Sequence, residues 1–145
     1  MKLDALRLKI PELLTELGED PAELSLGTDA WVVHRGTVTG YVAILGADKP
    51  EADPFLHVKF RVVKLPQRGR ETLLRTLLSL NHDLGNYAAF SVDENDCVWL
   101  GAGRFCADVE EPELLELVTQ TARLADRYDD DLIETFGQEV SLSQS

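Results

Sequence analysis

The residues of this chain that could do chemistry are three histidines, two cysteines and many carboxylates. His34, His57 and His82 are far apart and form none of the HxH, HxxxH or HExxH spacings by which neighbouring imidazoles converge on zinc. Cys97 and Cys106 lack the CxxC spacing of a metal or redox site, so we expect reduced, half-buried packing residues. The sequence therefore predicts no catalytic residue, no metal site and no cofactor.

Two short motifs resemble ligand sites only superficially. Gly101-Ala102-Gly103 lacks the third glycine, the following helix and the Lys-Ser/Thr pair of a phosphate-binding loop. Glycines inside a strand more often mark a bulge or a close approach of another chain segment. The carboxylates of Asp129-Asp130-Asp131 point about 100° apart on a helix and cannot converge on one cation. We interpret that run as a solvated helix face.

The charge of the chain restricts its partners. Fourteen basic and 26 acidic side chains give a net charge of −12, and residues 108–137 alone contain ten acids and two arginines. This field repels nucleic acid, so we expect no direct nucleic-acid binding. No apolar run approaches the ~20 residues that cross a bilayer, which predicts a cytoplasmic protein with no membrane contact.

A basic segment breaks this acidity. Between Lys59 and Arg75 there are six bases and one acid, Glu71. The molecule should therefore be electrically asymmetric, which suits a basic or mixed-charge protein partner.

Periodicity predicts the elements of the first half. Leucines and Ile10 recur at helical spacing from Leu3 to Leu17, with Pro11 expected to kink the helix or start its second part. A hairpin is predicted from two β-rich runs, and a third strand then alternates between a buried face and a wet, basic face. These strands are expected at 30–34, 38–45 and 55–64, with a surface loop at 47–54.

The second half repeats the change from helix to strands. A leucine-rich helix from Glu71 ends at Gly85, and a long amphipathic helix is expected from Pro112 to Phe136. Between them, strands are predicted at 87–92 and 97–105. The resulting order, α-β-β-β-α-β-β-α, indicates an α+β fold with a five-stranded antiparallel sheet and three helices. We expect one domain at residues 1–137 and a flexible tail at 138–145.

Particular segments resemble a known family. They are the end of the middle helix, Leu77-Leu78-Ser79-Leu80-Asn81-His82, the strands with Phe90-Ser91-Val92-Asp93 and Val98-Trp99-Leu100, and the acidic helix from Ala122 to Tyr128. Together with the order of elements, these segments resemble the YbjN family. That family is similar in fold to the class I type III secretion chaperones, and the resemblance covers almost the whole chain.

The resemblance implies a small, acidic, non-enzymatic bacterial protein. Such proteins are commonly homodimers and hold an extended segment of a client protein. The YbjN resemblance implies a regulatory or stress-linked role. We add the hypothesis that the client is basic or DNA-binding, because an acidic helix would attract it.

Six residues are our candidates for partner binding. Three line the wet face of the third strand, and three are aromatic residues of the predicted strands that would make good anchors if they face outward. They are His57, Lys59, Arg61, Trp31, Tyr41 and Trp99. Two alternatives remain open: a small-molecule sensor or enzyme with a pocket between sheet and helices, and a structural homodimer within a larger assembly.

Overall fold

The computed structural model describes residues 1–49, 51 and 53–142. Its elements follow the predicted order: α1 (Leu3–Glu16), β1 (Ala30–Arg35), β2 (Val38–Leu45), β3 (Phe55–Lys64), α2 (Arg70–Leu84), β4 (Ala89–Val92), β5 (Cys97–Phe105) and α3 (Glu111–Phe136), with short 3-10 turns η1 (Cys106–Asp108) and η2 (Gln138–Val140). The α+β prediction is therefore confirmed. Of the loop predicted at 47–54, Pro50 and Ala52 lie outside the described residues.

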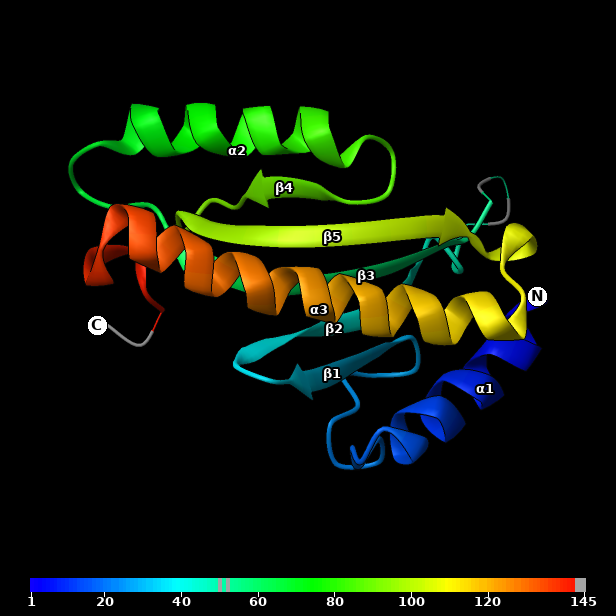
Figure 1. Ribbon diagram of the computed structural model, residues 1–145. Helices are drawn as coiled ribbons and strands as arrows, with labels where there is room; N and C mark the ends of the chain where they lie inside the picture. Colours follow the sequence, from blue (N-terminus) through cyan, green and yellow to red (C-terminus); the bar gives the residue numbers. More distant parts are fainter. Residues whose placement is uncertain (50, 52, 143–145) are drawn as a thin grey trace.

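The five strands form one antiparallel sheet in the order β1-β2-β3-β5-β4. Figure 1 shows α3 lying across one face of this sheet, with α1 beyond β1 and α2 beyond β4. We call the face toward α3 the inner face and the opposite one the outer face. Because side chains alternate along a strand, every strand sends one set of residues to each face.

The core lies between the inner face and the helices. On β3 the buried residues Leu56, Val58, Phe60 and Val62 alternate with more exposed neighbours, as the sequence predicts. Leu114, Val118 and Ala125 of α3 are fully buried in the same cluster, together with Leu6, Ile10 and Leu14 of α1. These apolar side chains pack into one hydrophobic cluster between the sheet and α3.

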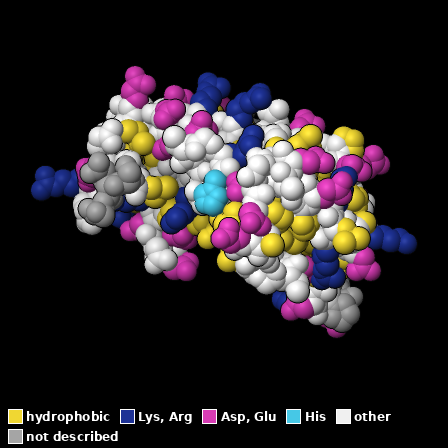
Figure 2. Space-filling model, turned by 90° about the horizontal axis from the view of Figure 1, so that it is seen from below, with side chains coloured by type: hydrophobic (Ala, Val, Ile, Leu, Met, Phe, Trp, Pro, Cys, Tyr) yellow, Lys and Arg dark blue, Asp and Glu magenta, His cyan; other side chains and the backbone are white. Residues whose placement is uncertain are grey.

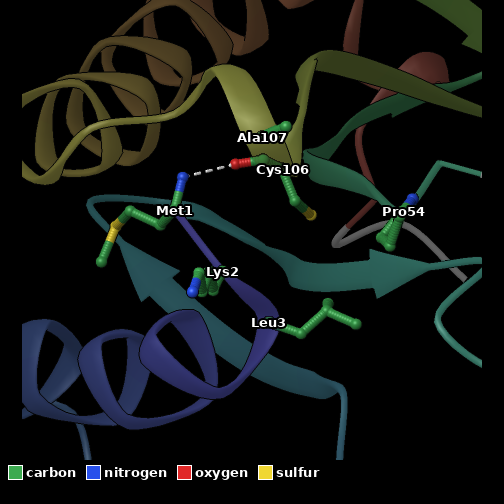
Figure 3. Close-up of a pocket in the computed structure, with 6 residues that line it drawn as sticks. All are labelled: Met1, Lys2, Leu3, Pro54, Cys106 and Ala107. Carbon is green, nitrogen blue, oxygen red and sulfur yellow. Dashed lines mark hydrogen bonds between the residues drawn. The ribbon is translucent and has the colours of Figure 1, made fainter.

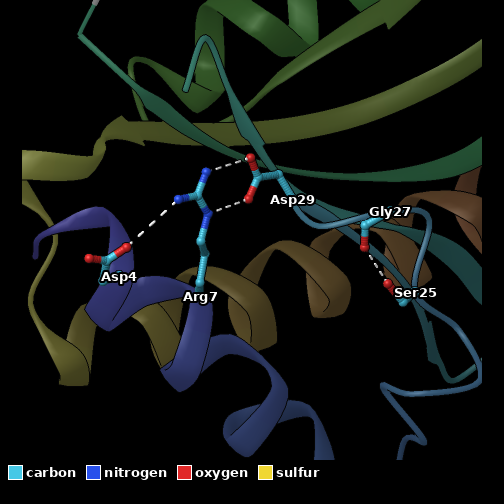
Figure 4. Close-up of polar contacts among 5 residues, drawn as sticks. All are labelled: Asp4, Arg7, Ser25, Gly27 and Asp29. Carbon is cyan, nitrogen blue, oxygen red and sulfur yellow. Dashed lines mark hydrogen bonds and ion pairs between the residues drawn. The ribbon is translucent and has the colours of Figure 1, made fainter. Parts of the chain in front are cut away.

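α1 is fastened to the sheet by a bidentate ion pair. Arg7 donates from Nε to Asp29 Oδ1 at 2.7 Å and from Nη2 to Asp29 Oδ2 at 3.0 Å (Figure 4). The hydrogen bond from Arg7 lowers the pKa of the Asp29 carboxyl. Since Asp29 directly precedes β1, the pair fixes the helix against the first strand.

The sequence-based boundaries need three corrections. α1 continues through Pro11 as one helix, which excludes the second start at Pro11 that the sequence left open beside a kink. β4 begins at Ala89 rather than residue 87, because the Tyr87 N–H bonds back to Leu84 O in the turn after α2. The segment from Gln138 is packed as far as Ser141: Gly137 takes φ 89° and turns the chain so that Val140 is fully buried. Residues 143–145 of the predicted tail lie outside the described residues.

Candidate partner-binding surfaces

Five of the six candidate residues lie on the outer face of the sheet. His57, Lys59 and Arg61 alternate along β3, while Tyr41 pairs with Lys59 on one side and Trp99 pairs with Arg61 on the other. The Tyr41 and Trp99 rings stack with centroids 5.6 Å apart, and Lys59 Nζ lies 4.4 Å from the Trp99 centroid. We call Tyr41, His57, Lys59, Arg61 and Trp99 the sheet-face cluster. It places the Lys59 ammonium directly against the face of Trp99.

Trp31 does not join this cluster. It pairs with Val42 on the inner face and is 5 % exposed within the hydrophobic core. The run Trp31-Val32-Val33 is apolar at every position, so alternation alone could not tell which face the tryptophan occupies.

Trp99 is held in place by a residue that the sequence analysis did not select. Its Nε1–H donates to Asp93 Oδ2 at 2.9 Å, and the other oxygen, Asp93 Oδ1, accepts the N–H groups of Asn95 and Cys97, each at 2.9 Å. These hydrogen bonds lower the pKa of Asp93, and the bond from Trp99 has the largest effect. Asp93 is the first residue of the turn Asp93-Glu94-Asn95-Asp96. An aspartate at the start of a turn commonly accepts backbone N–H groups, so this sequence pattern could have identified Asp93 as a structural residue.

The glycines of β5 make room for side chains of β3. A Cβ at Gly101 would lie 2.8 Å from His57 Nε2, and one at Gly103 would collide with the Phe55 ring. The chain segment that approaches these glycines closely, as the sequence predicted, is therefore β3, through the side chains of Phe55 and His57. The pKa of His57 is lowered mainly by burial of the imidazole and, to a smaller extent, by the positive charge of Lys59.

The β4 edge of the sheet is closed by a side chain of α2. Phe90 N–H donates to Asn81 Oδ1 at 2.6 Å, and Asn81 Nδ2 donates to Phe90 O at 3.2 Å. One amide thus occupies both backbone groups that Phe90 turns away from the sheet. This prevents another strand from pairing there.

The β1 edge is closed by the connection from α1. Leu26 N–H donates to Ala30 O at 2.8 Å, Val32 N–H donates to Leu24 O at 3.0 Å, and His34 N–H donates to Glu19 Oε1 at 2.6 Å. The sheet edges formed by β1 and β4 are therefore both engaged by the chain itself.

The remaining candidates from the sequence do not assemble into a metal site. Within residues 1–49, 51 and 53–142, no group of three or more His, Cys, Asp or Glu side chains could hold a metal ion. Both cysteines are buried thiols, and burial raises the pKa of each. Asp129 and Asp131 diverge: Asp129 meets Thr37 Oγ1 at 2.7 Å, whereas Asp131 lies 3.7 Å from Arg127 Nε.

Apolar hollows lie where helices meet other elements. A groove of about 260 Å³ between α2 and β4 is lined by Leu74, Leu78 and Val92, and one of about 300 Å³ lies between α1 and α3. Figure 2, seen from the side of α1 and β1, shows hydrophobic side chains open to solvent among charged ones. A third hollow, of about 490 Å³, is formed by Met1–Leu3, Pro54, Cys106 and Ala107, where Met1 N donates to Cys106 O at 2.7 Å (Figure 3).

Comparison with solved structures shows what this arrangement resembles. A chain in the crystal structure of the ExsC–ExsE complex matches with a TM-score of 0.60 and 18 % identity, over 90 % of this chain and 96 % of its own. The fold is similar to that of class I type III secretion chaperones. Two further matches agree. One is in the HopA1–SchA chaperone–effector complex, with a TM-score of 0.61 and 13 % identity over 90 % and 98 % of the two chains.

The other is in the complex of the Yersinia pestis type III secretion chaperone SycH with a stable fragment of YscM2. Its TM-score is 0.56 and its identity 20 %, over 84 % and 98 % of the two chains. No family model matches the sequence. No curated protein matches it either. Among the described residues, no helix is long and apolar enough to cross a membrane.

Proposed function

We propose that this protein is a non-enzymatic adaptor or chaperone-like module that holds an extended segment of a client protein. The observation that carries the proposal is the fold: three chains with the same architecture over at least 84 % of this one were each solved in complex with a protein partner. The same α+β scaffold here presents cations and aromatic rings side by side on the outer face of the sheet.

The sheet-face cluster is our proposed contact surface. Arg61 is exposed, while His57, Lys59 and Tyr41 are half-buried, so their side chains offer polar tips on apolar stems. Trp99 is only 7 % exposed and is anchored by Asp93, so it supports Lys59 and Tyr41 more than it reaches outward itself. Binding energy would then come from aromatic and cationic side chains that are already ordered before the client arrives.

The remaining parts of the proposal rest on the net charge and on the resemblance to the YbjN family. A net charge of −12 favours a basic or mixed-charge client, including a segment of a DNA-binding protein, and the acidic groups of a mixed-charge client would meet Lys59 and Arg61. We further propose a cytoplasmic homodimer related to the YbjN proteins, with a regulatory or stress-linked role. A small-molecule pocket between sheet and helices is less well supported, because side chains such as Phe60, Leu100 and Leu114 are fully buried there.

Affinity purification tests this function. The tagged protein is recovered from its own cells at low and at moderate salt, and the bound proteins are identified by mass spectrometry. We expect one dominant protein whose recovery falls as salt screens the charges. Sedimentation of the purified protein reports the dimer. Absence of any stoichiometric protein at both salt concentrations would refute the adaptor role.

A further inference from the structure

β5 extends beyond its edge partner. β4 pairs with Val98 through Gly101 and begins at Ala89, whereas β5 continues to Phe105. Among the described strands, the last four residues of β5, 102–105, therefore pair only with β3 on their other side. Figure 1 shows this end of β5 reaching past the connection between α2 and β4. We call these four residues the β5 extension.

The hydrogen-bonding pattern identifies which backbone groups of the β5 extension point outward. Phe90 turns its N–H and C=O away from β5 and toward Asn81. Its paired residue on β5 is Leu100, and the backbone N–H and C=O of Leu100 must therefore point toward β3. Orientation alternates along a strand, which turns the N–H groups of Gly103 and Phe105 toward the open side. Among the described residues, no protein group accepts a hydrogen bond from either N–H. These two donors are therefore available to another strand.

A groove runs along the outer side of these donors. It has a volume of about 320 Å³, with Gly101 and Gly103 as its floor, Phe55 and His57 as one wall, and the turn around Asn86 as the other. Phe105 is 50 % exposed and packs edge-to-face on Phe55 with centroids 5.5 Å apart. A strand residue opposite Gly103 would point its side chain into this groove, because paired residues share a face. The aromatic wall and the absence of side chains on the floor suit a large apolar residue.

The inner side of the same edge is polar and acidic. Arg104 faces a small hollow with Tyr87, Glu113 and Glu116. Tyr87 Oη is buried there and has no hydrogen-bond partner within the part of the chain that the structure describes. From Asp108 to Glu116 the chain carries five acids and no lysine or arginine. A strand residue next to the one in the groove would point to this side. A lysine or arginine would meet Glu113 and Glu116 there.

We propose that the β5 extension binds an extended client segment in which a large apolar residue alternates with lysine or arginine. This inference rests on the proposed function and gives it a location and a recognition rule. Both other sheet edges are occupied by Asn81 and by the segment from Glu19 to Leu26. The added strand would accept hydrogen bonds from Gly103 and Phe105, which is β-strand addition.

The probe is a short synthetic peptide that alternates leucine and lysine, titrated by fluorescence anisotropy. We expect it to bind, to protect the Gly103 and Phe105 amides from hydrogen exchange, and to bind more tightly than the same peptide with glutamate in place of lysine. The variant Phe105→Pro removes one edge N–H. Phe105 has φ −61°, which proline adopts without strain, so the fold should be kept.

Phe105→Ala is the matched control, since both variants lose the ring and only the proline loses the donor. We expect the proline variant to bind the peptide about tenfold more weakly than the alanine variant. Glu113→Gln and Glu116→Gln should each weaken the lysine peptide about threefold. Circular dichroism melts of all variants report whether the fold is intact.

Three results would overturn the location. The first is that the proline and alanine variants bind the peptide with equal affinity. The second is that the peptide does not bind to the wild-type protein. The third is concentration-dependent amide protection at Phe105 without peptide, which would indicate a second copy of the protein on this edge. The client purification separates the two proposals. A client recovered equally by Phe105→Pro and by Phe105→Ala leaves the adaptor function standing and removes only the β5 extension.

Discussion

The amide of Asn81 binds both backbone groups of Phe90, accepting from its N–H at 2.6 Å and donating to its C=O at 3.2 Å. A single side chain near the end of α2 thus takes the place of a neighbouring strand at the middle of β4. An open β edge promotes unwanted pairing between molecules, so this contact protects the protein as well as stabilising it.

Asn81→Ala should therefore have two effects. Losing both hydrogen bonds should lower the free energy of unfolding by about 1–2 kcal/mol, because Phe90 is only 7 % exposed. The opened edge should also increase aggregation on concentration. Urea unfolding and light scattering measure the two effects. His82→Ala, at the exposed next position, is the control and should change stability by less than about 0.5 kcal/mol.

Leu77 and Leu78 are adjacent on α2 and should differ sharply in their effect on stability. Leu77 is 3 % exposed, so Leu77→Ala should cost about 2–5 kcal/mol through lost burial and a residual cavity. Leu78 is 69 % exposed, and Leu78→Ala should cost less than about 0.5 kcal/mol. Chemical denaturation of both variants tests the orientation of the helix. Similar losses at the two positions would contradict it.

Reversing charge on the sheet-face cluster should reduce client binding without unfolding the protein. In the double variant Lys59→Glu/Arg61→Glu, the acidic groups of a mixed-charge client lose two cations with which they could pair, while these partly exposed side chains contribute little to stability. The readout is client recovery at low salt, alongside a thermal melt. Arg75→Glu/Arg123→Glu makes the same change in net charge at exposed positions on α2 and α3. If both pairs reduce recovery equally, overall charge and not the cluster directs binding.

The carboxyl of Asp93 should make stability depend on pH in the acid range. Hydrogen bonds from Trp99 Nε1 and then from Cys97 N–H lower its pKa below the ordinary 3.8. Its stabilising contribution is therefore complete above pH 3.8 and is lost as the pH falls through the lower pKa of the folded state. Asp93→Asn should be less stable at neutral pH and should lose less stability on acidification. Urea titrations across that range compare it with Glu94→Gln, an exposed neighbour.

Two carboxylates on α3 compete for one hydroxyl proton. Thr37 Oγ1 lies 2.6 Å from Asp126 Oδ1 and 2.7 Å from Asp129 Oδ2, and it has a single hydrogen to donate. Hydrogen bonds from the Thr37 hydroxyl and then its N–H lower the pKa of Asp126, whereas burial raises the pKa of Asp129. Asp129 therefore takes up a proton at a higher pH than Asp126 does, and in its protonated form it can donate to Thr37.

The expected consequence is opposite for the two residues. Because the pKa of Asp129 is raised in the folded state, its ionisation destabilises the fold as pH rises through that value. Asp129→Asn should increase stability at neutral pH, and Asp126→Ala should decrease it. Thermal melts at neutral and mildly acidic pH show both effects, with Asp130→Asn as the exposed control. A destabilised Asp129→Asn at neutral pH would contradict this assignment.

The sequence by itself determined the order of elements, the alternation of β3 and the apolar stripes of α1 and α3, because these depend on local periodicity of 2 or 3.6 residues. It also placed His57, Lys59 and Arg61 on one face. The ends of elements depend on hydrogen bonds that periodicity does not encode, as at Ala89, where a turn hydrogen bond from Tyr87 N–H to Leu84 O delays the start of the strand.

The tertiary structure decided everything that depends on register between distant segments. Only strand pairing puts Tyr41 and Trp99 on opposite sides of β3 within stacking distance, and only packing sends Trp31 to the core while Trp99 faces outward. The contacts of Asn81 with Phe90 and of Glu19 with His34 likewise join residues from different elements. The length by which β5 exceeds β4 follows from the same pairing, since a local pattern does not specify where a neighbouring strand stops.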